Sequence, residues 1–452
     1  MTSRPILFRN GHLITLEAMG ELPTADILVV DGRIAEIGSS LSVPDAETVD
    51  CTGLIVMPGL VNAHLHTWQT ALRGIGADWT PADYTTQMHQ GMGPLFTADD
   101  LYWSTLLGAQ TQLLNGVTTL VDWCHNNPTP DHASRAIDAL EAAGGRAVFM
   151  HGAPKPRQRP GKRHFSEIPQ SPAEIARLHA RTRAGNGLVT LGMAIQGPHY
   201  SLYEVTVADL ELAGKYDLVA SMHVGGPVPI TPDGWTRLIA DDLVSNRINV
   251  VHGQSLTDTE MDRLIERGVT FTPAPEGEML QGHGFPVIGR VARRGGALSI
   301  GTDIESCNGS DMFTSARFGL AATRALDDIA SAQRGTVAPA VSVTCRDALE
   351  WMTIGGARML GLDDKIGSLR VGKQADLLAL RVSDLNLWPM HDPVRCIVSQ
   401  AGTCNIAFVA IDGEIVVRQG KLTTRSHVDT AFNAAAVGRR IVAEFAASMQ
   451  PR

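Results

Sequence analysis

His64 and His66 have the residue types and the spacing of metal ligands. They end the apolar run 54–61 with the order His64-Leu65-His66. The side chains of a strand alternate between its two faces, so residues two apart project to the same side. Two imidazole nitrogens on one side can bind a single divalent ion. We therefore expect a metal-dependent enzyme, although a His-x-His pair taken alone also occurs at surfaces by chance.

The sequence around these histidines repeats one unit, made of a short apolar run, a polar loop and a helical stretch. The helical stretches begin with N-cap residues such as Thr97, Ser171 and Thr257. Eight such alternations predict an α/β fold, a (β/α)₈ TIM barrel, whose chemistry takes place where the strands end. The eight apolar runs are residues 60–66, 117–122, 146–151, 188–196, 218–223, 248–252, 269–273 and 297–303.

Five polar side chains lie at the carboxyl ends of these predicted strands. Since parallel strands end on the same side of a barrel, the five would meet at one mouth. Imidazoles and a carboxylate are suitable ligands for Zn²⁺ or Fe²⁺. Taken singly, each histidine can be a hydrogen-bonded barrel residue and the aspartate a helix N-cap, but together they predict a metal centre. The five are His64, His66, His223, His252 and Asp303.

These segments resemble the amidohydrolase superfamily, in particular its branch of triazine hydrolases and of nucleoside, S-adenosylhomocysteine and base deaminases. The resemblance covers nearly the full chain and implies a homodimer or a higher homo-oligomer. It rests on PGLVNAHLH at 58–66, MHV at 222–224, VHG at 251–253 and SIGTD at 299–303, and extends to IGSLRVGKQADLL at 366–378 and VAIDGEIV at 409–416.

The resemblance implies that His64, His66, His223 and Asp303 bind one divalent ion per chain, Zn²⁺ before Fe²⁺. Asp303 would also take a proton from the attacking water, and His252 would polarise the substrate or hold the hydroxide. A divalent ion lowers the pKa of bound water from about 16 to about 7, so hydroxide is available at neutral pH. Two-metal members carry a carboxylated lysine at strand four. The run 188–196 has no lysine, which predicts a single ion.

The fifth predicted strand departs from the deaminase pattern. Deaminases of this branch carry His-x-x-Glu there, and the glutamate passes a proton to the leaving amine, whereas this chain reads HVGG at 223–226. Such assistance is worth about 10²–10⁴ in rate. We therefore consider Glu276, Glu278 and His283 as replacements, because they lie in the Gly- and Pro-rich loop 272–284 after strand seven. The alternative is that both glutamates are solvated and that His283 packs locally.

Trp68, Gln69 and His199 are further candidates for contact with the substrate. Trp68 can stack on a ring and Gln69 can bind a heteroatom. His199, in GPHY at 197–200, resembles the deaminase segment whose histidine contacts the substrate. Each has a structural alternative, in packing or in a loop. The segment 79–92 is typical of a lid-like insertion.

Composition favours a globular enzyme of 452 residues with a small-molecule substrate. The net charge of −9 argues against nucleic acid as a partner. The basic stretch 155–164 is read as a solvated loop or a subunit contact, or as a means of steering an anionic substrate. Six cysteines without Cys-x-x-Cys spacing predict free thiols. No signal peptide and no membrane span are expected, which makes the cytoplasm the default location.

The two ends of the chain have strand-like alternation that neither half can bury alone. We predict that residues 1–57 and 363–425 together form a small β-sandwich domain beside a barrel of residues 58–362. Residues 426–452 have helical spacing and would form a C-terminal helix that packs on the barrel or on a neighbouring subunit.

The sequence thus predicts a mononuclear hydrolase in which metal-bound hydroxide attacks an electron-poor carbon of a small, nitrogen-containing heterocycle. A deaminase, which acts on carbon–nitrogen bonds other than peptide bonds, is the first choice. The missing glutamate leaves open a hydrolase of a urea, carbamate, thiocarbamate or chlorinated ring. A non-catalytic scaffold of the same fold is the alternative from another class. It is disfavoured because a barrel without chemistry has no need to keep four desolvated metal-binding groups together.

Overall fold

Eight parallel strands form the barrel that the sequence predicts. The computed structural model describes residues 4–226, 228–423 and 427–449. The strands follow one another in sheet order from β6 to β13. A parallel bridge between Leu65 and Asp303, and a hydrogen bond from the Ala63 amide to the Ile300 carbonyl, join β6 to the chain beyond β13. The strands are β6 (Leu60–Leu65), β7 (Val117–Cys124), β8 (Arg146–Gly152), β9 (Val189–Ile195), β10 (Ala220–Val224), β11 (Ile248–His252), β12 (Thr270–Thr272) and β13 (Ala297–Leu298).

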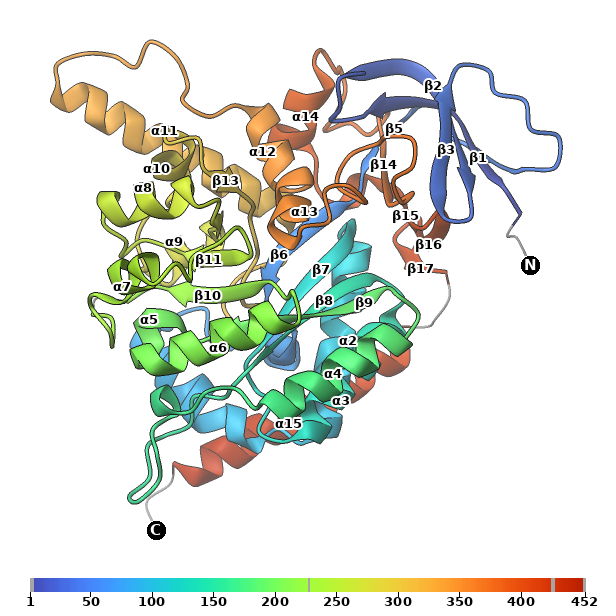
Figure 1. Ribbon diagram of the computed structural model, residues 1–452. Coiled ribbons are helices and arrows are strands. Elements are labelled where there is room, and N and C mark those ends of the chain that lie inside the picture. The colour runs from blue at the N-terminus through green and yellow to red at the C-terminus, as the bar shows by residue number, and fades with distance from the viewer. Residues whose placement is uncertain (1–3, 227, 424–426, 450–452) are drawn as a thin grey trace.

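Helices follow each barrel strand and cover the outside of the barrel (Figure 1). The predicted caps are confirmed, since the side chains of Thr97, Ser171 and Thr257 accept backbone N–H groups at the starts of α2, α4 and α8. The helices between the barrel strands are α1 (Pro81–Asp83), α2 (Ala98–Leu114), α3 (Pro130–Ala143), α4 (Pro172–Ala184), α5 (Gly197–Tyr200), α6 (Tyr203–Lys215), α7 (Gly234–Ala240), α8 (Asp258–Glu266), α9 (Pro275–Leu280) and α10 (Ile288–Ala292). Those after β13 are α11 (Met312–Gln333), α12 (Cys345–Trp351), α13 (Ile354–Leu360), α14 (Pro393–Gln400) and α15 (Val428–Ser448).

In the part of the chain that the structure describes, the loops add one π-helical segment and four 3₁₀ turns. The π-helical segment η2 (Tyr84–Met92) falls in the predicted lid-like insertion. The 3₁₀ turns are η1 (Thr67–Leu72), η3 (Gly93–Leu95), η4 (Phe165–Glu167) and η5 (Thr403–Asn405).

Strands from both termini form a second, nine-stranded mixed sheet, as predicted for the small β domain. Hydrogen bonding runs through it without a break, in the order β17-β16-β15-β14-β5-β1-β2-β3, with β4 beside β1. The N- and C-terminal parts meet where β5 pairs with β14. The strands are β1 (Ile6–Ile14), β2 (Glu21–Val30), β3 (Arg33–Gly38), β4 (Glu47–Asp50), β5 (Leu54–Pro58), β14 (Leu377–Arg381), β15 (Ile406–Ile411), β16 (Glu414–Arg418) and β17 (Lys421–Leu422).

Arg146 joins this sheet to the barrel. It begins β8, and its guanidinium binds the carboxylates of Asp376 at 2.9 Å and Asp412 at 2.7 Å. Since β8 starts there, the terminal sheet is attached at the amino ends of the barrel strands. The carboxyl ends, where the chemistry of such barrels lies, point away from this attachment.

The C-terminal helix α15 packs on α2 and η1 of its own chain. Arg440 of α15 pairs with Asp100 at the start of α2. The helix comes so close that a Cβ at Gly438 would lie 2.2 Å from the carbonyl oxygen of Ala71. Among the described residues, no helix has the length and apolar character needed to cross a membrane.

Candidate active site

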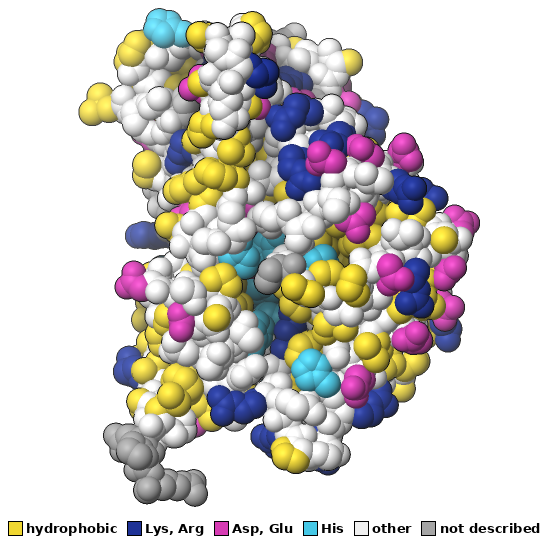
Figure 2. All heavy atoms as spheres, turned by 90° about the vertical axis from the view of Figure 1, so that its left-hand side faces the viewer, with side chains coloured by type: hydrophobic (Ala, Val, Ile, Leu, Met, Phe, Trp, Pro, Cys, Tyr) yellow, Lys and Arg dark blue, Asp and Glu magenta, His cyan; other side chains and the backbone are white. Residues whose placement is uncertain are grey.

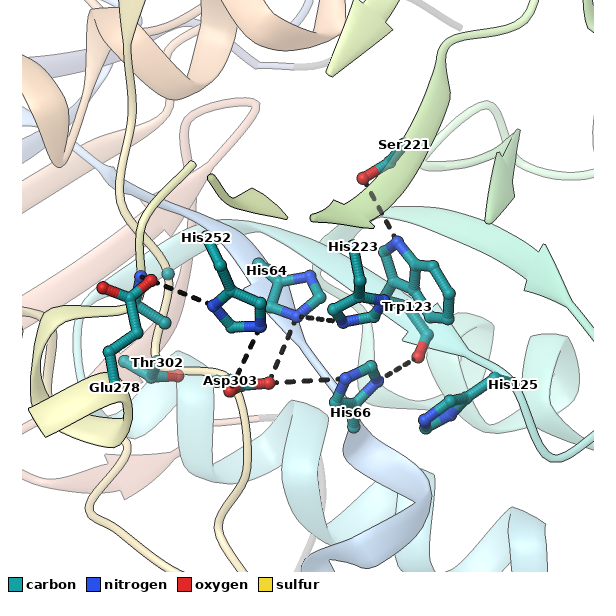
Figure 3. Close-up of polar contacts among 12 residues, drawn as sticks. His64, His66, Trp123, His125, Ser221, His223, His252, Glu278, Thr302 and Asp303 are labelled. Carbon is teal, nitrogen blue, oxygen red and sulfur yellow. Dashed lines mark hydrogen bonds and ion pairs between the residues drawn. The ribbon is translucent and has the colours of Figure 1, made fainter. Parts of the chain in front are cut away.

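Four buried side chains bring their ligand atoms together at the carboxyl ends of the barrel strands. Atoms of His64, His223, His252 and Asp303 lie within 4.8 Å of one another. His64 Nε2 is 3.2 Å from both His223 Nε2 and Asp303 Oδ1. Figure 3 shows the rings of His64 and His252 turned toward the Asp303 carboxylate and the ring of His223 turned toward His64. They come from β6, β10, β11 and the segment after β13, as the predicted strand ends require.

His66 lies beside His64 and faces the same oxygen of the Asp303 carboxylate. Its Nδ1–H donates a hydrogen bond to the carbonyl of Trp123. The free lone pair is therefore on Nε2, which lies 3.4 Å from Asp303 Oδ1. A ring nitrogen fixed in this way by a bond at the opposite nitrogen is typical of a metal-ligating histidine. The structure thus brings together His64, His66, His223 and Asp303, and adds His252, whose Nε2 is 3.9 Å from Asp303 Oδ2.

The protonation states of the cluster match a divalent cation. Burial lowers the pKa of His64 to about 4 and that of His223 well below its usual value, so both rings are neutral at pH 7. Burial of Asp303 favours the neutral acid, but its contacts with His64 and His66 hold its pKa well below the usual range. Neutral imidazoles and one carboxylate are a donor set that Zn²⁺ accepts. The residues present therefore fit a metal ion.

Glu278 lies behind His252 and is fully buried. Its Oε1 accepts the Nδ1–H of His252 at 2.9 Å and the backbone N–H of Ala274 at 2.9 Å. Burial lowers the pKa of His252, but Glu278 and the charge of Asp303 outweigh this effect and raise it above its usual value. Glu278 therefore orients His252 and favours its protonated form.

His252 and Asp303 share an unusual backbone conformation. Their φ angles are 67° and 63°, in the left-handed region that residues other than glycine avoid. Such conformations cost about 1–3 kcal/mol each and occur mainly where function requires a particular side-chain position. Both residues thus carry strain at the points where they turn toward the cluster.

A cavity of about 740 Å³ opens above the cluster. Figure 2 shows histidine side chains at the bottom of a hollow in this face of the molecule. The predicted lid-like insertion supplies one wall, through Pro81, Ala82, Tyr84, Thr85, His89 and Gln90. The remaining lining residues are His66, His125, Lys155, Phe165, Tyr200, His223, Gly225, Gly226, His252, Gln254, Ser255, Gln281, Gly282, His283, Asp303 and Ile304.

Of the predicted replacements for the missing glutamate, only His283 lines the cavity. Its ring stacks on that of His252, with centroids 5.5 Å apart, and its Nε2 is 3.2 Å from Gln281 Oε1. Glu276 turns elsewhere, since its Oε1 faces the amide of Gly309 at 3.4 Å. Glu278 has no place on the cavity wall because it is bound to His252. The structure therefore does not place either glutamate where a leaving group would be.

Trp68 and Gln69 lie one layer behind the cavity wall. The indole N–H of Trp68 donates to Nδ1 of His125 at 2.9 Å. The amide N–H of Gln69 donates to the hydroxyl of Tyr84 at 2.5 Å. Both residues are almost fully buried, since the Trp68 ring packs on Phe96 and the Gln69 amide oxygen also accepts the hydroxyl of Ser306. They therefore hold residues that line the cavity, whereas the sequence interpretation placed them in contact with the substrate.

His199 also lies outside the cavity lining. Its Nε2 is 2.9 Å from the hydroxyl of Ser255, which does line the cavity. Burial lowers its pKa, so the ring is neutral at pH 7. His199 is therefore connected to the cavity by its hydrogen bond with Ser255.

Sequence reasoning missed several residues of the cavity wall, among them His125, Lys155 and Gln254. His125 directly follows β7 and lies three residues beyond the predicted end of that strand at 122. Lys155 was grouped with a basic stretch, although it lies only three residues beyond β8. Gln254 follows His252 by two residues, and neither atom of its buried amide has a hydrogen-bond partner among the described residues.

Gly226 occupies the position at which deaminases of this branch carry glutamate. Its φ is 91°, a conformation that glycine adopts freely and a side-chain residue rarely adopts. A Cβ there would meet only the hydroxyl of Tyr200, at 3.9 Å. The backbone, and not a lack of space, therefore disfavours a glutamate at this position.

Comparisons with known proteins agree with this architecture. The sequence model described as "Amidohydrolase family" matches residues 55–416. The chain is 29% identical to the 5-methylthioadenosine/S-adenosylhomocysteine deaminase of Desulforudis audaxviator, over 97% of this chain and 99% of the relative. It is 30% identical to the 5'-deoxyadenosine deaminase of Methanothermobacter thermautotrophicus, over 89% and 91%.

Two solved structures have the same fold. An adenosine deaminase from Xanthomonas campestris with bound zinc superimposes with a TM-score of 0.82 at 25% identity, over 97% of this chain and 98% of that one. A triazine hydrolase variant superimposes with a TM-score of 0.84 at 21% identity, over 96% and 99%.

Proposed function

The chain belongs to the amidohydrolase family, and we propose that it is a mononuclear, metal-dependent aminohydrolase that removes an amino group from a small heterocyclic molecule. The observation that carries the proposal is the cluster of buried imidazoles and one carboxylate at the floor of the cavity. The deaminase names of the relatives support ammonia as the product.

His64, His66, His223 and Asp303 would hold one divalent ion, Zn²⁺ as the first choice and Fe²⁺ as the second. When bound, the ion supplies a Lewis acid that makes a water molecule acidic near neutral pH. The zinc in the Xanthomonas relative supports this choice. The strand β9 carries no lysine that could bridge a second ion, which supports one ion per chain.

Asp303 and His252 are the groups that would handle protons and charge. Asp303 stays ionised in the cluster, so its carboxylate can accept a proton from the attacking water. His252 would face the group under attack and withdraw electron density from it. Glu278 fixes the Nδ1–H of His252, so Nε2 is the nitrogen that is left for this task. We assign Glu278 as a positioning residue for that reason.

The cavity wall fits a planar, nitrogen-containing ring. Aromatic side chains of Tyr84, Phe165 and Tyr200 line it and offer surfaces for stacking. His125 accepts the indole N–H at Nδ1, so its neutral ring carries the proton on Nε2 and can donate it to a substrate acceptor. The unpaired amide of Gln254 can complete a donor and acceptor pair on the ring edge.

Gly226 supports a second candidate, the hydrolysis of a urea, carbamate, thiocarbamate or chlorinated ring. Departure from these substrates depends less on a strong acid, and the usual acid is absent at this position. Within the first proposal, His283 is the remaining predicted group on the cavity wall that could protonate a leaving amine.

The test combines metal analysis with a substrate panel. The purified full chain is assayed for bound Zn²⁺ and Fe²⁺ and for its homo-oligomeric state. Ammonia release is then measured with 5'-deoxyadenosine and with aminated purines, pyrimidines, pterins and triazines. We expect about one metal ion per chain and ammonia from at least one aminated ring. Turnover only of ureas, carbamates or halogenated rings would establish the second candidate. Metal-free protein without any turnover would favour a non-catalytic scaffold.

A further inference from the structure

Lys155 places a positive charge on the cavity wall that no carboxylate among the described residues balances. Its Nζ lies over the ring of Tyr200, 4.0 Å from the centroid. Within residues 4–226, 228–423 and 427–449, no carboxylate lies within ion-pairing distance of this ammonium, and no acceptor hydrogen-bonds to it. A cation–π contact contributes about 0.5–2 kcal/mol. Lys155 is partly exposed and lines the cavity, so its ammonium is open to a ligand, and Tyr200 is its one partner among the described residues.

The other groups around the cavity do not supply the missing negative charge. Asp303 is the only carboxylate among the described lining residues, and its charge is required by the metal cluster. His89, His125 and His223 have pKa values well below the usual one because they are buried, so they are neutral at pH 7. The described lining therefore offers Lys155 no free anion.

We propose that Lys155 binds a carboxylate of the substrate, which makes the substrate an anionic heterocycle. A single cation beside a tyrosine suits a monoanion, because phosphate dianions are usually held by several donors. The position fits this role, since Lys155 follows β8 whereas the cluster is formed mainly by β6, β10 and β11. Burial lowers the pKa of Lys155 to about 8, as expected for a cation without a partner.

This inference rests on the proposed function for the amino group that is removed, but the anion site can be tested without turnover. The probes are pyridine-3-carboxylate and its neutral counterpart of the same shape, pyridine-3-carboxamide. Their binding to the zinc-loaded and the metal-free full chain is measured by titration calorimetry at pH 7. We expect the carboxylate to bind at least about tenfold more tightly than the amide in both forms.

Three variants locate the charge that is responsible. Lys155→Met keeps an unbranched side chain of similar size without the charge and should lower carboxylate affinity about tenfold or more, with little change for the amide. Lys155→Arg keeps the charge and should retain most of the carboxylate affinity. Lys162→Met removes an exposed cation of the same basic stretch and should change neither affinity. Circular dichroism and metal content establish that each variant is folded.

Several other outcomes of the binding experiment overturn the proposal. Equal affinity for the two probes in the wild type, or no binding of the carboxylate at about 10 mM, removes the anion site. Unchanged carboxylate binding in Lys155→Met assigns the anion to the metal. A loss of affinity of the same size in Lys162→Met would attribute anion binding to the combined positive charge of the basic stretch 155–164. If Lys155 governs binding but no aminated ring releases ammonia, the proposed function fails and the anion site stands.

A kinetic comparison separates anion binding from proton donation by Lys155. On matched aminated rings with and without a carboxylate, Lys155→Met should reduce kcat/KM only for the carboxylate members. An equal loss of kcat for both members would make Lys155 a proton donor and overturn the proposal.

Discussion

Glu278 holds His252 through a 2.9 Å hydrogen bond that lies wholly inside the protein. The carboxylate faces the Nδ1 side of the ring, and Asp303 faces the Nε2 side. His252 is thus held between two carboxylates, and its pKa is raised although it is buried. The loop after β12 contributes to the site through this contact, and not through an acid on the cavity wall.

Replacing Glu278 by glutamine should impair catalysis without removing the metal. Glu278→Gln keeps the size of the side chain but loses its charge, so the pKa of His252 should fall. We expect kcat/KM to decrease about 10–100-fold, as is typical for loss of one oriented catalytic contact. The pH profile of kcat/KM and the metal content should be measured together.

Glu276→Gln is the matched control for this experiment. Glu276 lies in the same helix, α9, but faces Gly309. Its replacement should change kcat/KM less than about threefold. If Glu276→Gln impaired turnover and Glu278→Gln did not, the assignment of Glu278 as a positioning residue would be wrong.

Asp303→Asn should nearly abolish turnover. Asparagine has the shape of aspartate but cannot take up the proton of the attacking water, and it weakens the hold on a divalent ion. We expect kcat to fall by about 10³-fold or more. Removal of the metal with a chelator should abolish the wild-type activity, and Zn²⁺ or Fe²⁺ should restore it. Rates near those of the wild type for Asp303→Asn would refute the role assigned to this residue.

The barrel and its metal cluster could be predicted from the sequence because both depend on periodicity. Parallel strands must end on one side, so His64, His223 and His252 had to converge once the strands were identified. The extent of the final strand was harder to predict. The predicted run 297–303 is a strand only over Ala297–Leu298. The chain then passes so close to β6 that a Cβ at Gly301 would lie 2.5 Å from the carbonyl oxygen of His64.

Side-chain direction could not be predicted in the same way. Trp68 and Gln69 were expected to face the substrate because they follow a ligand strand, but the 3₁₀ turn η1 directs them toward the protein interior. Lys155 was interpreted with its basic neighbours, although those neighbours are exposed and Lys155 faces the cavity. The direction of a loop side chain is set by tertiary packing, on which local sequence has little influence.

Gln254 should matter for activity and not for stability. Its amide has no hydrogen-bond partner among the described residues, so Gln254→Leu should change the free energy of unfolding by less than about 1 kcal/mol. We expect kcat/KM to fall about 10–100-fold, because the substrate loses a pair of hydrogen bonds.

The contrast for Gln254 is Gln170, whose amide is fully engaged. Its side-chain N–H donates to the carbonyl of Ala194 at 2.9 Å, and its Oε1 pairs with His151. Gln170→Leu should therefore lower the free energy of unfolding by about 1–3 kcal/mol. In urea denaturation Gln170→Leu should be the less stable variant, whereas in steady-state kinetics Gln254→Leu should be the less active one. A strongly destabilised Gln254→Leu with normal kinetics would count against a substrate contact.

Lys155→Met should stabilise the protein in a pH-dependent manner. The pKa of Lys155 is about 8 in the folded chain and about 10.5 in the unfolded chain, because burial disfavours the charge. Below pH 8 the lysine is charged in both states, and the folded state bears the full cost. Between pH 8 and 10.5 the folded state loses its proton first, and the cost declines. The variant should thus be more stable by about 1–3 kcal/mol at pH 7, with a difference that vanishes as the pH approaches 10.5.

Denaturation of the wild type and of Lys155→Met at a series of pH values measures this difference in the free energy of unfolding. Lys162→Met should show none, since Lys162 is exposed. If the stability gain for Lys155→Met did not vary with pH, the charge of Lys155 would not destabilise the folded state, and this prediction would be wrong.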